Sequence, residues 1–175
     1  LVPMDITDAE KVDHMSALIN QRFGRLDILV GNAGILGILS PLGHIEPKIW
    51  DQVIAVNLSA NWRLLRAMDP LLHSSDAGRA IFVTSTVGAE ARAYWGAYAV
   101  SKAALEMMTR TYAKEIATTP IRVNLVNPGG TRTQMRSQAM PGEDPNSLPT
   151  PEDRAGVFVD LALPSCTANG QLFTA

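Results

Sequence analysis

The chain has 175 residues, which is enough for one domain with a packed core and too few for two domains of typical size. Apolar residues make up 46% of it and charged residues 18%, a composition that excludes a disordered or collagen-like protein. The 15 basic and 17 acidic side chains give a net charge of -2, which argues against a nucleic-acid partner because neutralising phosphates requires clustered Lys and Arg. No stretch approaches the roughly 18 consecutive apolar residues of a membrane span, so we expect no membrane partner either.

The chain contains one cysteine, Cys166, which by itself can form neither an internal disulfide nor a zinc site. Its three histidines, His14, His44 and His73, are far apart and lack the spacing of metal ligands. The sequence therefore predicts no metal site. It also predicts a cytoplasmic protein, because no disulfide framework and no signal peptide point to secretion.

The chain begins at Leu1 without an initiator Met and without a polar leader. We interpret Leu1 to Met4 as the remnant of a strand and expect one incomplete domain over residues 1–175. A helix is predicted over Asp8 to Phe23, where apolar residues recur every three or four positions. Thr7 or Asp8 is its candidate N-cap, and Gly24 is its expected end.

Three short runs rich in Ile, Val and Leu follow, at Leu26 to Val30, Ala80 to Thr84 and Ile121 to Val126. Each run is apolar nearly throughout and ends in turn-forming residues, which is typical of strands buried on both faces of a parallel sheet. A last strand is expected to begin near Gly170.

Two more helices are predicted between these strands, over Pro47 to Leu72 and Tyr98 to Thr118. Met140 to Pro151, with four prolines, is predicted to be a long loop. The alternation of strands and helices predicts an α/β fold with a doubly wound parallel sheet.

The turns Gly31 to Gly34, Ser85 to Gly88 and Asn127 to Gly130 follow the three predicted strands. Asp5 and Ile6 take the same position after Leu1 to Met4. Because ligands of such sheets bind beyond the carboxyl ends of the strands, we expect these segments to meet at one crevice.

Tyr98 and Lys102 are four residues apart at the start of a predicted helix and so share one face of it. A nearby ammonium favours the phenolate form of a tyrosine and so suits it to acid–base work. Such a pair is also common on the surface of amphipathic helices. Ser85 at a strand end and Asn57 within an apolar helix face favour the functional interpretation, since a buried amide needs a partner.

These residues together make the chain resemble the short-chain dehydrogenase/reductase family, over essentially all of its length. The elements that carry the resemblance stand in the family's order and spacing. They are Asn32-Ala33-Gly34, Asn57, Ser85, Tyr98-x-x-x-Lys102 and Pro128-Gly129-Gly130-Thr131-Arg132-Thr133. The resemblance implies a Rossmann-like fold of three layers that lacks the family's first strand–helix units.

The resemblance implies an NAD(P)-dependent oxidoreductase that interconverts a secondary alcohol and a ketone. Tyr98 would be the general acid or base, and Lys102 would lower the pKa of Tyr98 and bind the nicotinamide ribose. Ser85 would hold the substrate oxygen, and Asn57 would hold a water that links Lys102 to solvent. Trp95, just before the helix, is a further candidate for the substrate pocket.

The resemblance also implies where the cofactor, NAD or NADP, would lie. Asp5 and Ile6 would contact the adenine, and Asn32, Ala33 and Gly34 the adenosine half. Pro128, Gly129 and Thr131 would surround the nicotinamide, with Thr133 near the pyrophosphate and Tyr98 and Lys102 at the ribose.

The family's glycine-rich turn, TGxxxGxG, is absent from the sequence, as are the residues that would separate NAD from NADP. Two alternatives therefore stay open. One is a non-catalytic nucleotide-binding or scaffold protein, and the other is an epimerase or dehydratase acting on a nucleotide-sugar. The resemblance further implies a homodimer or homotetramer, to which the apolar stripe of Ala103, Met107 and Thr111 would contribute.

Overall fold

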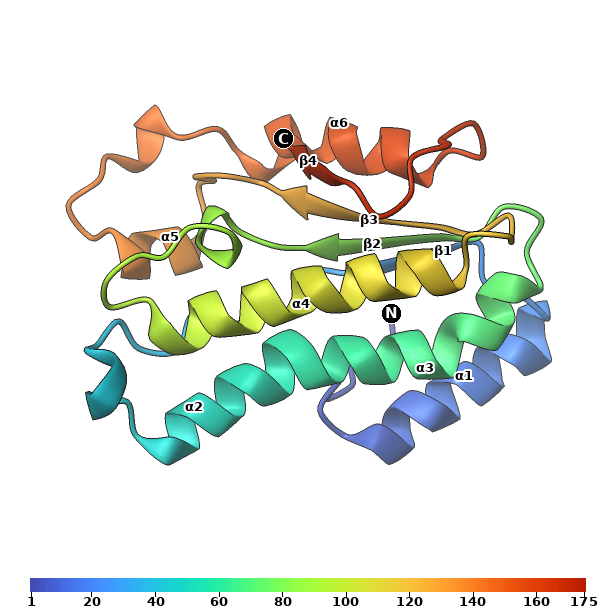
Figure 1. The fold of residues 1–175 in the computed structure, drawn as a ribbon, viewed down its shortest axis with the longest axis horizontal. Helices are drawn as coiled ribbons and strands as arrows, with labels where there is room; N and C mark the ends of the chain where they lie inside the picture. Colours follow the sequence, from blue (N-terminus) through green and yellow to red (C-terminus); the bar gives the residue numbers. More distant parts are fainter.

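The computed structural model describes residues 1–175, in which helices alternate with short parallel strands (Figure 1). The helices are α1 (Ala9–Phe23), α2 (Pro47–Ile54), α3 (Ala60–His73), α4 (Gly96–Glu115), α5 (Gln134–Ala139) and α6 (Pro151–Ala162). The strands are β1 (Ile28–Gly31), β2 (Arg79–Val83), β3 (Arg122–Asn127) and β4 (Leu172–Thr174). No helix combines the length and the apolar character that crossing a bilayer requires.

The four strands are all parallel and lie in the order β1-β2-β3-β4. In Figure 1, α3 and α4 lie on one face of the sheet with α1 beside them, while α6 lies on the other face. Helices on both faces of a parallel sheet make three layers. The predicted α/β, doubly wound, Rossmann-like fold is confirmed.

The two faces of the sheet bury two separate apolar clusters. Successive residues of a strand point to opposite faces, so Phe82 of β2 faces α3 and α4, whereas Ile81 faces α6. Phe82 packs in one cluster with Leu72 and Leu105, and all three are fully buried. Ile81 packs with Leu161 of α6. Each such side chain stabilises the fold by about 1.5–3 kcal/mol relative to the exposed state.

The first of the three predicted strands is buried on one face only, so the expectation of burial on both faces was wrong for β1. Ile28 and Val30 are 45% and 44% exposed, while Leu29 between them is buried. The physical reason is position, because β1 is an edge strand and α6 packs against β2 and β3.

The expectation of a strand at Leu1 to Met4 was also wrong. These residues form no strand, and the sheet has no partner for them. A strand requires a neighbour to accept and donate its backbone hydrogen bonds, and in this structure β1 pairs with β2 alone.

The predicted helices are present, with adjusted boundaries. Asp8 caps α1 by accepting a hydrogen bond from the Lys11 N–H, and Gly24 ends it in the left-handed region with a φ of 71°. The helix predicted over Pro47 to Leu72 runs as α2 and α3 joined by a π-helical turn at Ala55–Ser59. The inserted residue of such a turn alters which side chains face inward, and π-turns are frequent at functional sites.

Two helices were missed by the sequence analysis. α5 follows the Pro128–Thr133 segment, and α6 begins at Pro151, the end of the predicted long loop. That loop contains only a short 3-10 turn at Pro145–Ser147. The signal for α6 lay in the sequence, because Thr150 and Asp153 have the spacing of a capping box and form one in the structure.

Candidate active site

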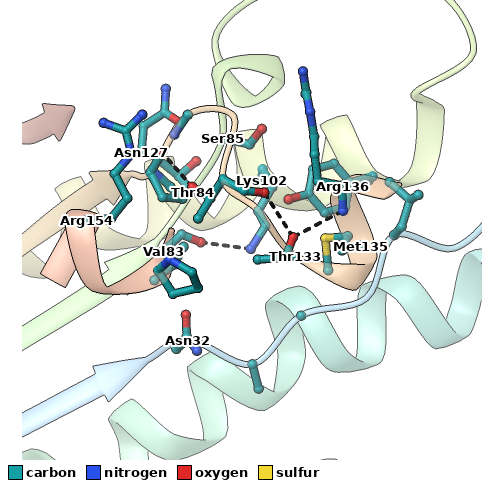
Figure 2. A pocket seen from close by; sticks show the side chains of 18 of the residues that line it. Asn32, Val83, Thr84, Ser85, Lys102, Asn127, Thr133, Met135, Arg136 and Arg154 are labelled. Carbon is teal, nitrogen blue, oxygen red and sulfur yellow. Dashed lines mark hydrogen bonds between the residues drawn. The ribbon is translucent and has the colours of Figure 1, made fainter. Parts of the chain in front are cut away.

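A cavity of about 800 Å³ opens at the carboxyl ends of β1, β2 and β3 (Figure 2). The three turns expected to converge do meet there, as the position of the crevice in parallel sheets requires. The predicted site residues that line it are Asn32, Ala33, Gly34, Ser85, Trp95, Tyr98, Lys102, Pro128, Gly129, Thr131 and Thr133.

Two aromatic side chains at the start of α4 form part of the cavity wall. Trp95 is the residue before the helix, and Tyr98 lies in its first turn. Their rings meet edge to face, with centroids 5.9 Å apart, and both side chains are 9% exposed. Tyr94 precedes them with a φ of 74°, a conformation that costs a non-glycine residue about 1–2 kcal/mol and that turns the chain into the helix.

Lys102 is buried one turn further along the same face of α4. Its Nζ donates a hydrogen bond to the Val83 carbonyl over 2.8 Å and lies 5.6 Å from the centroid of the Tyr98 ring. Burial disfavours the ammonium and lowers the pKa of Lys102 to about 8. The lysine can therefore exist both charged and neutral near physiological pH.

Burial acts on Tyr98 in the opposite direction, because it disfavours the phenolate and raises the pKa of the phenol. The Ser85 hydroxyl counteracts this by hydrogen bonding, which lowers the pKa in part. The tyrosine is thus held as a neutral acid with a second hydroxyl beside it. This is the arrangement that proton donation to a substrate oxygen requires.

The segment that carries Ser85 is fastened to α4 by a residue that the sequence analysis missed. Glu106, 2% exposed, accepts a hydrogen bond from the Thr84 hydroxyl over 2.8 Å and one from Arg110 over 2.9 Å. Gly88 packs against the same carboxylate, because a Cβ there would lie 2.7 Å from Glu106 Oε1. Glu106 is two helical turns from Tyr98, and that spacing was the only signal for it.

Asn57 lies behind the cavity wall rather than in it. It is fully buried in the π-helical turn, and its amide pairs with both the N–H and the carbonyl of Ile35, at 2.8 and 2.9 Å. Its Nδ2 also donates to the Ser101 hydroxyl over 3.0 Å. A Cβ at Gly34 would lie 3.5 Å from both Asn57 Oδ1 and Lys102 Nζ, so both groups approach Gly34.

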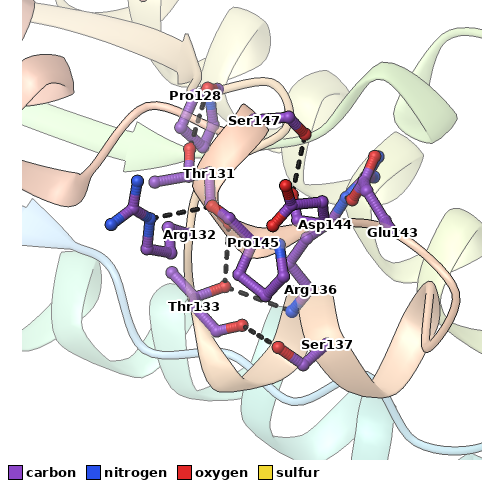
Figure 3. Close-up of polar contacts among 10 residues, drawn as sticks. All are labelled: Pro128, Thr131, Arg132, Thr133, Arg136, Ser137, Glu143, Asp144, Pro145 and Ser147. Carbon is purple, nitrogen blue, oxygen red and sulfur yellow. Dashed lines mark hydrogen bonds and ion pairs between the residues drawn. The ribbon is translucent and has the colours of Figure 1, made fainter.

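The loop after β3 forms the opposite wall. The Asn127 carboxamide accepts from the Gly129 N–H and donates to the Thr86 hydroxyl, both over 3.0 Å. The Thr131 hydroxyl donates to the Pro128 carbonyl over 3.1 Å (Figure 3). These bonds link the loop after β3 to itself and to the turn after β2.

Thr133 ends this loop by capping α5, since its hydroxyl accepts a hydrogen bond from the Arg136 N–H over 3.1 Å. Arg132 donates to the Pro145 carbonyl over 2.8 Å, and Arg136 pairs with Glu143 (Figure 3). The loop that follows α5 is therefore tied back onto the segment beside the cavity.

Asp5 and Ile6 are the two predicted cofactor residues that the structure does not bring to the cavity. The Asp5 carboxylate accepts hydrogen bonds from the N–H and the hydroxyl of Thr7, at 2.9 and 2.7 Å. Those local bonds lower the pKa of Asp5 and shape the turn before α1. Arg136 and Arg154, by contrast, line the cavity and were missed.

No three His, Cys, Asp or Glu side chains of the chain gather closely enough to hold a metal ion. Ser85 and Tyr98 contribute hydroxyls to the cavity wall, and Lys102 contributes an amine.

Comparison with known proteins places this geometry in a family. The family model described as short chain dehydrogenase matches residues 1–144. The uncharacterized oxidoreductase YciK of Escherichia coli is 45% identical over 153 residues, which are 87% of this chain and 60% of YciK. A D-beta-hydroxybutyrate dehydrogenase of Rhizobium meliloti is 32% identical over 141 residues, which are 81% of this chain and 54% of that enzyme. This chain thus spans little more than half the length of these relatives.

A solved short-chain dehydrogenase of Shigella flexneri, in complex with NADP, superposes with a TM-score of 0.93 at 40% identity. The match covers 98% of this chain and 72% of that one. Sequence and fold agree, and the chain belongs to the short-chain dehydrogenase family.

Proposed function

We propose that this protein is an NAD(P)-dependent oxidoreductase that interconverts a secondary alcohol and a ketone. The observation that carries the proposal is the meeting of Ser85, Tyr98 and Lys102 at one cavity wall. Hydroxyls, a phenol and an amine are the groups that polarise and protonate a carbonyl without a metal.

The cavity suits a dinucleotide. Its volume of about 800 Å³ lies within the usual range for ligand sites, about 300–1,000 Å³. Asn32, Ala33 and Gly34 would hold the adenosine half, where small side chains let the ligand approach the backbone. Pro128, Gly129 and Thr131 would flank the nicotinamide, and Thr133 would lie near the pyrophosphate. Asp5 and Ile6 remain candidates for the adenine on the strength of the family's pattern alone.

When bound, the nicotinamide supplies the hydride in reduction and accepts it in oxidation. The Ser85 hydroxyl orients the substrate oxygen by donating a hydrogen bond to it. The Tyr98 phenol protonates that oxygen in reduction, and the Tyr98 phenolate accepts the alcohol proton in the reverse direction. The Lys102 ammonium stabilises the phenolate that Tyr98 becomes, which offsets the unfavourable effect of burial.

Asn57 belongs to the proposal as part of the path by which Lys102 exchanges protons with solvent. Its carboxamide adjoins Lys102 across Gly34, and its own position is fixed by Ile35 and Ser101. Trp95, whose ring packs on Tyr98, would contact the body of the substrate.

We further propose that the active form is a homodimer or homotetramer. Ala103, Met107 and Thr111 form an exposed stripe on α4, and Met107 is 62% exposed. A symmetric contact between two copies of α4 would bury this stripe against itself.

The proposal is tested by following NADH or NADPH absorbance with a panel of aliphatic and aromatic ketones. We expect turnover with one of the two cofactors and a fall of about 10²–10³-fold in kcat for Ser85→Ala. Ser74→Ala, which removes an exposed hydroxyl at the end of α3, is the matched control and should retain activity. Cofactor binding without turnover of any ketone would favour the non-catalytic nucleotide-binding alternative. Absence of cofactor binding would contradict both.

A further inference from the structure

Four apolar side chains line the part of the cavity next to Tyr98. They come from the loop after β1, from the residue before α4 and from α5, and they are Leu36, Trp95, Met135 and Ala139. Leu36, Trp95 and Ala139 belong with Tyr98 to one buried apolar cluster, against which Met135 packs. We call these four side chains the apolar wall.

The apolar wall offers almost no hydrogen-bonding partner to a bound group. Leucine and alanine side chains have neither donor nor acceptor, methionine has only a weakly accepting sulfur, and tryptophan has a single N–H. A charged group held against such a surface loses its water without gaining hydrogen bonds, whereas an apolar group is stabilised by leaving water. Burial also raises the pKa of the Tyr98 phenol, which shows that its surroundings disfavour charge.

The two arginines of the cavity do not add a charge to the apolar wall. Arg136 forms a bidentate pair with Glu143, from Nε over 2.6 Å and from Nη2 over 2.7 Å, which balances its charge. Figure 2 shows its side chain extending away from Met135, its neighbour on α5. Arg154 lies beside Asn127, on the other side of the cavity from Met135 (Figure 2).

Two further cations come near the aromatic residues of the site. Arg92 stacks over the Trp95 ring at 5.4 Å, but it is exposed and does not line the cavity. Lys102 Nζ donates to the Val83 carbonyl over 2.8 Å, and the proposed function uses its charge to stabilise the Tyr98 phenolate. A substrate group at the apolar wall therefore meets no cation that could balance a negative charge.

The position of the apolar wall relative to the proton donor relates it to the substrate. The proposed function assigns the turn after β1 and the loop after β3 to the dinucleotide, and it assigns none of the four apolar side chains to it. Ser85 and Tyr98 would hold the carbonyl oxygen, so a substituent of the carbonyl carbon must extend over the surface beside them. Trp95 is part of that surface, because its ring packs edge to face on Tyr98 with centroids 5.9 Å apart.

We propose that the substrate is an uncharged ketone, or the matching secondary alcohol, with a bulky apolar group on the carbonyl carbon, and that this group binds to the apolar wall. The inference rests on the proposed function, in which the carbonyl carbon takes a hydride from NADH or NADPH and the oxygen takes a proton from Tyr98. An aromatic ring suits this wall, because the Met135 thioether is flexible and makes favourable contacts with aromatic rings.

Three ketones test the inference with the purified protein, namely 4′-isopropylacetophenone, 4-acetylbenzoate and butanone. The first two are similar in size and shape and differ in charge, and butanone lacks the bulky group. We expect kcat/KM to be highest for 4′-isopropylacetophenone. It should exceed the value for 4-acetylbenzoate at least about 100-fold, because the carboxylate would lose its water at the apolar wall.

Met135→Gln places a polar amide in the apolar wall with little change of shape. It should lower kcat/KM for 4′-isopropylacetophenone by about tenfold and leave butanone nearly unchanged, which also shows that the variant is folded. Met135→Leu should keep the wild-type preference. Leu18→Gln, which changes an exposed apolar residue of α1, is the matched control and should alter no kcat/KM.

Two results would overturn the inference. One is a kcat/KM for 4-acetylbenzoate that equals or exceeds that for 4′-isopropylacetophenone. The other is a Met135→Gln protein that prefers 4′-isopropylacetophenone over butanone by the same factor as the wild type.

Failure of the proposed function gives a different pattern, in which neither dinucleotide supports turnover of any ketone. Calorimetric binding of 4′-isopropylacetophenone and 4-acetylbenzoate to the wild type and to Met135→Gln then tests the apolar wall alone. Tighter binding of the uncharged ketone that depends on Met135 would retain the apolar site without the oxidoreductase. Equal binding of the two ketones would overturn the inference as well.

Discussion

Burial shifts the pKa values of Tyr98 and Lys102, which lie on one face of α4, in opposite directions. Burial lowers the pKa of Lys102 to about 8 and raises the pKa of Tyr98. The Tyr98 phenolate and the Lys102 ammonium stabilise each other, so we expect the two residues to gain and lose protons as a coupled pair. The Ser85 hydroxyl adds a hydrogen bond that favours the phenolate.

The buried Lys102 predicts a specific dependence of stability on pH. Its pKa is about 8 in the folded protein and 10.5 in its unperturbed state, so the unfolded chain binds more protons between these values. The free energy of unfolding should therefore rise with pH across this window, by up to about 3 kcal/mol from this residue. Urea unfolding of the cofactor-free protein from about pH 8 to pH 9, below the ordinary tyrosine pKa of 10.0, measures the rise.

In Lys102→Met this rise should be absent, whereas Lys114→Met, which removes an exposed lysine of the same helix, should retain it. Parallel profiles for the wild type and Lys102→Met would show that burial does not perturb this amine.

Glu106 makes a second prediction at the scale of one residue. Glu106→Ala leaves the buried Thr84 hydroxyl without its acceptor and opens space beside Gly88. We expect the free energy of unfolding to fall by about 2–4 kcal/mol, as for other broken buried pairs. Thermal and urea unfolding measure the loss.

Glu115→Ala, which removes an exposed glutamate of the same helix, is the control for Glu106 and should change the free energy of unfolding by less than about 0.5 kcal/mol. A Glu106→Ala protein as stable as this control would mean that the carboxylate does not hold the segment before Ser85.

At the scale of the elements, β1, β2 and α3 pack closely together at Gly31, the last residue of β1. A Cβ on Gly31 would lie 2.3 Å from Asn61 Oδ1 of α3 and 2.3 Å from the Phe82 ring of β2. Between β1, its neighbour β2 and helix α3 there is therefore no room for a methyl group at the residue before Asn32. This close approach sets where the first cavity turn begins.

Gly31→Ala should consequently destabilise the protein by about 1–3 kcal/mol through overpacking. Gly156→Ala in α6 is the matched comparison, because nothing lies within 4 Å of its Cβ position. Alanine there should stabilise the helix by about 0.8–1 kcal/mol, since it is the better helix former. We expect the urea midpoint to fall for Gly31→Ala and to rise for Gly156→Ala. Equal shifts of the midpoint in the two variants would contradict the packing described at β1.

Elements with a strong local pattern could be predicted from the sequence. The apolar period and the Asp8 and Gly24 caps fix α1, and the continuous apolar runs fix β2 and β3. The exposed face of β1 could not be predicted, because it depends on which helices pack against which strands. α6 lacked a clear apolar period, although its capping box was readable.

The same division holds for the site. The residues that follow strand ends, and the Tyr98–Lys102 pair, converge as predicted because sheet topology and helix period bring them together. Arg154 and Glu106 escaped prediction because their positions depend on contacts between distant segments, such as that of Arg154 with the Gly129 loop. Asp5 was expected at the cavity because it would follow a strand at Leu1 to Met4, but those residues form no strand and Asp5 lies outside the cavity.

At the scale of the whole molecule, one face of the sheet is better covered than the other. α3 and α4 shield the face that holds the larger apolar cluster, and α6 covers part of the opposite face (Figure 1). The cavity lies across the end of this layered body, so groups from β1, β2, α4 and the loop after β3 all reach it. The proposed catalysis therefore depends on the relative placement of elements that are distant in sequence.

The most direct measurement is the turnover of Tyr98→Phe with NADH and NADPH, beside Tyr112→Phe. Both residues are buried tyrosines of α4, but Tyr112 lies outside the cavity and donates its hydroxyl hydrogen to Asp69 over 2.6 Å. Tyr98→Phe should lose about 10²–10⁴-fold in kcat, the contribution of a general acid, while still binding the dinucleotide. Tyr112→Phe should keep its turnover and lose only stability. Equal turnover in Tyr98→Phe and the wild type would contradict the assignment of Tyr98 as the proton donor.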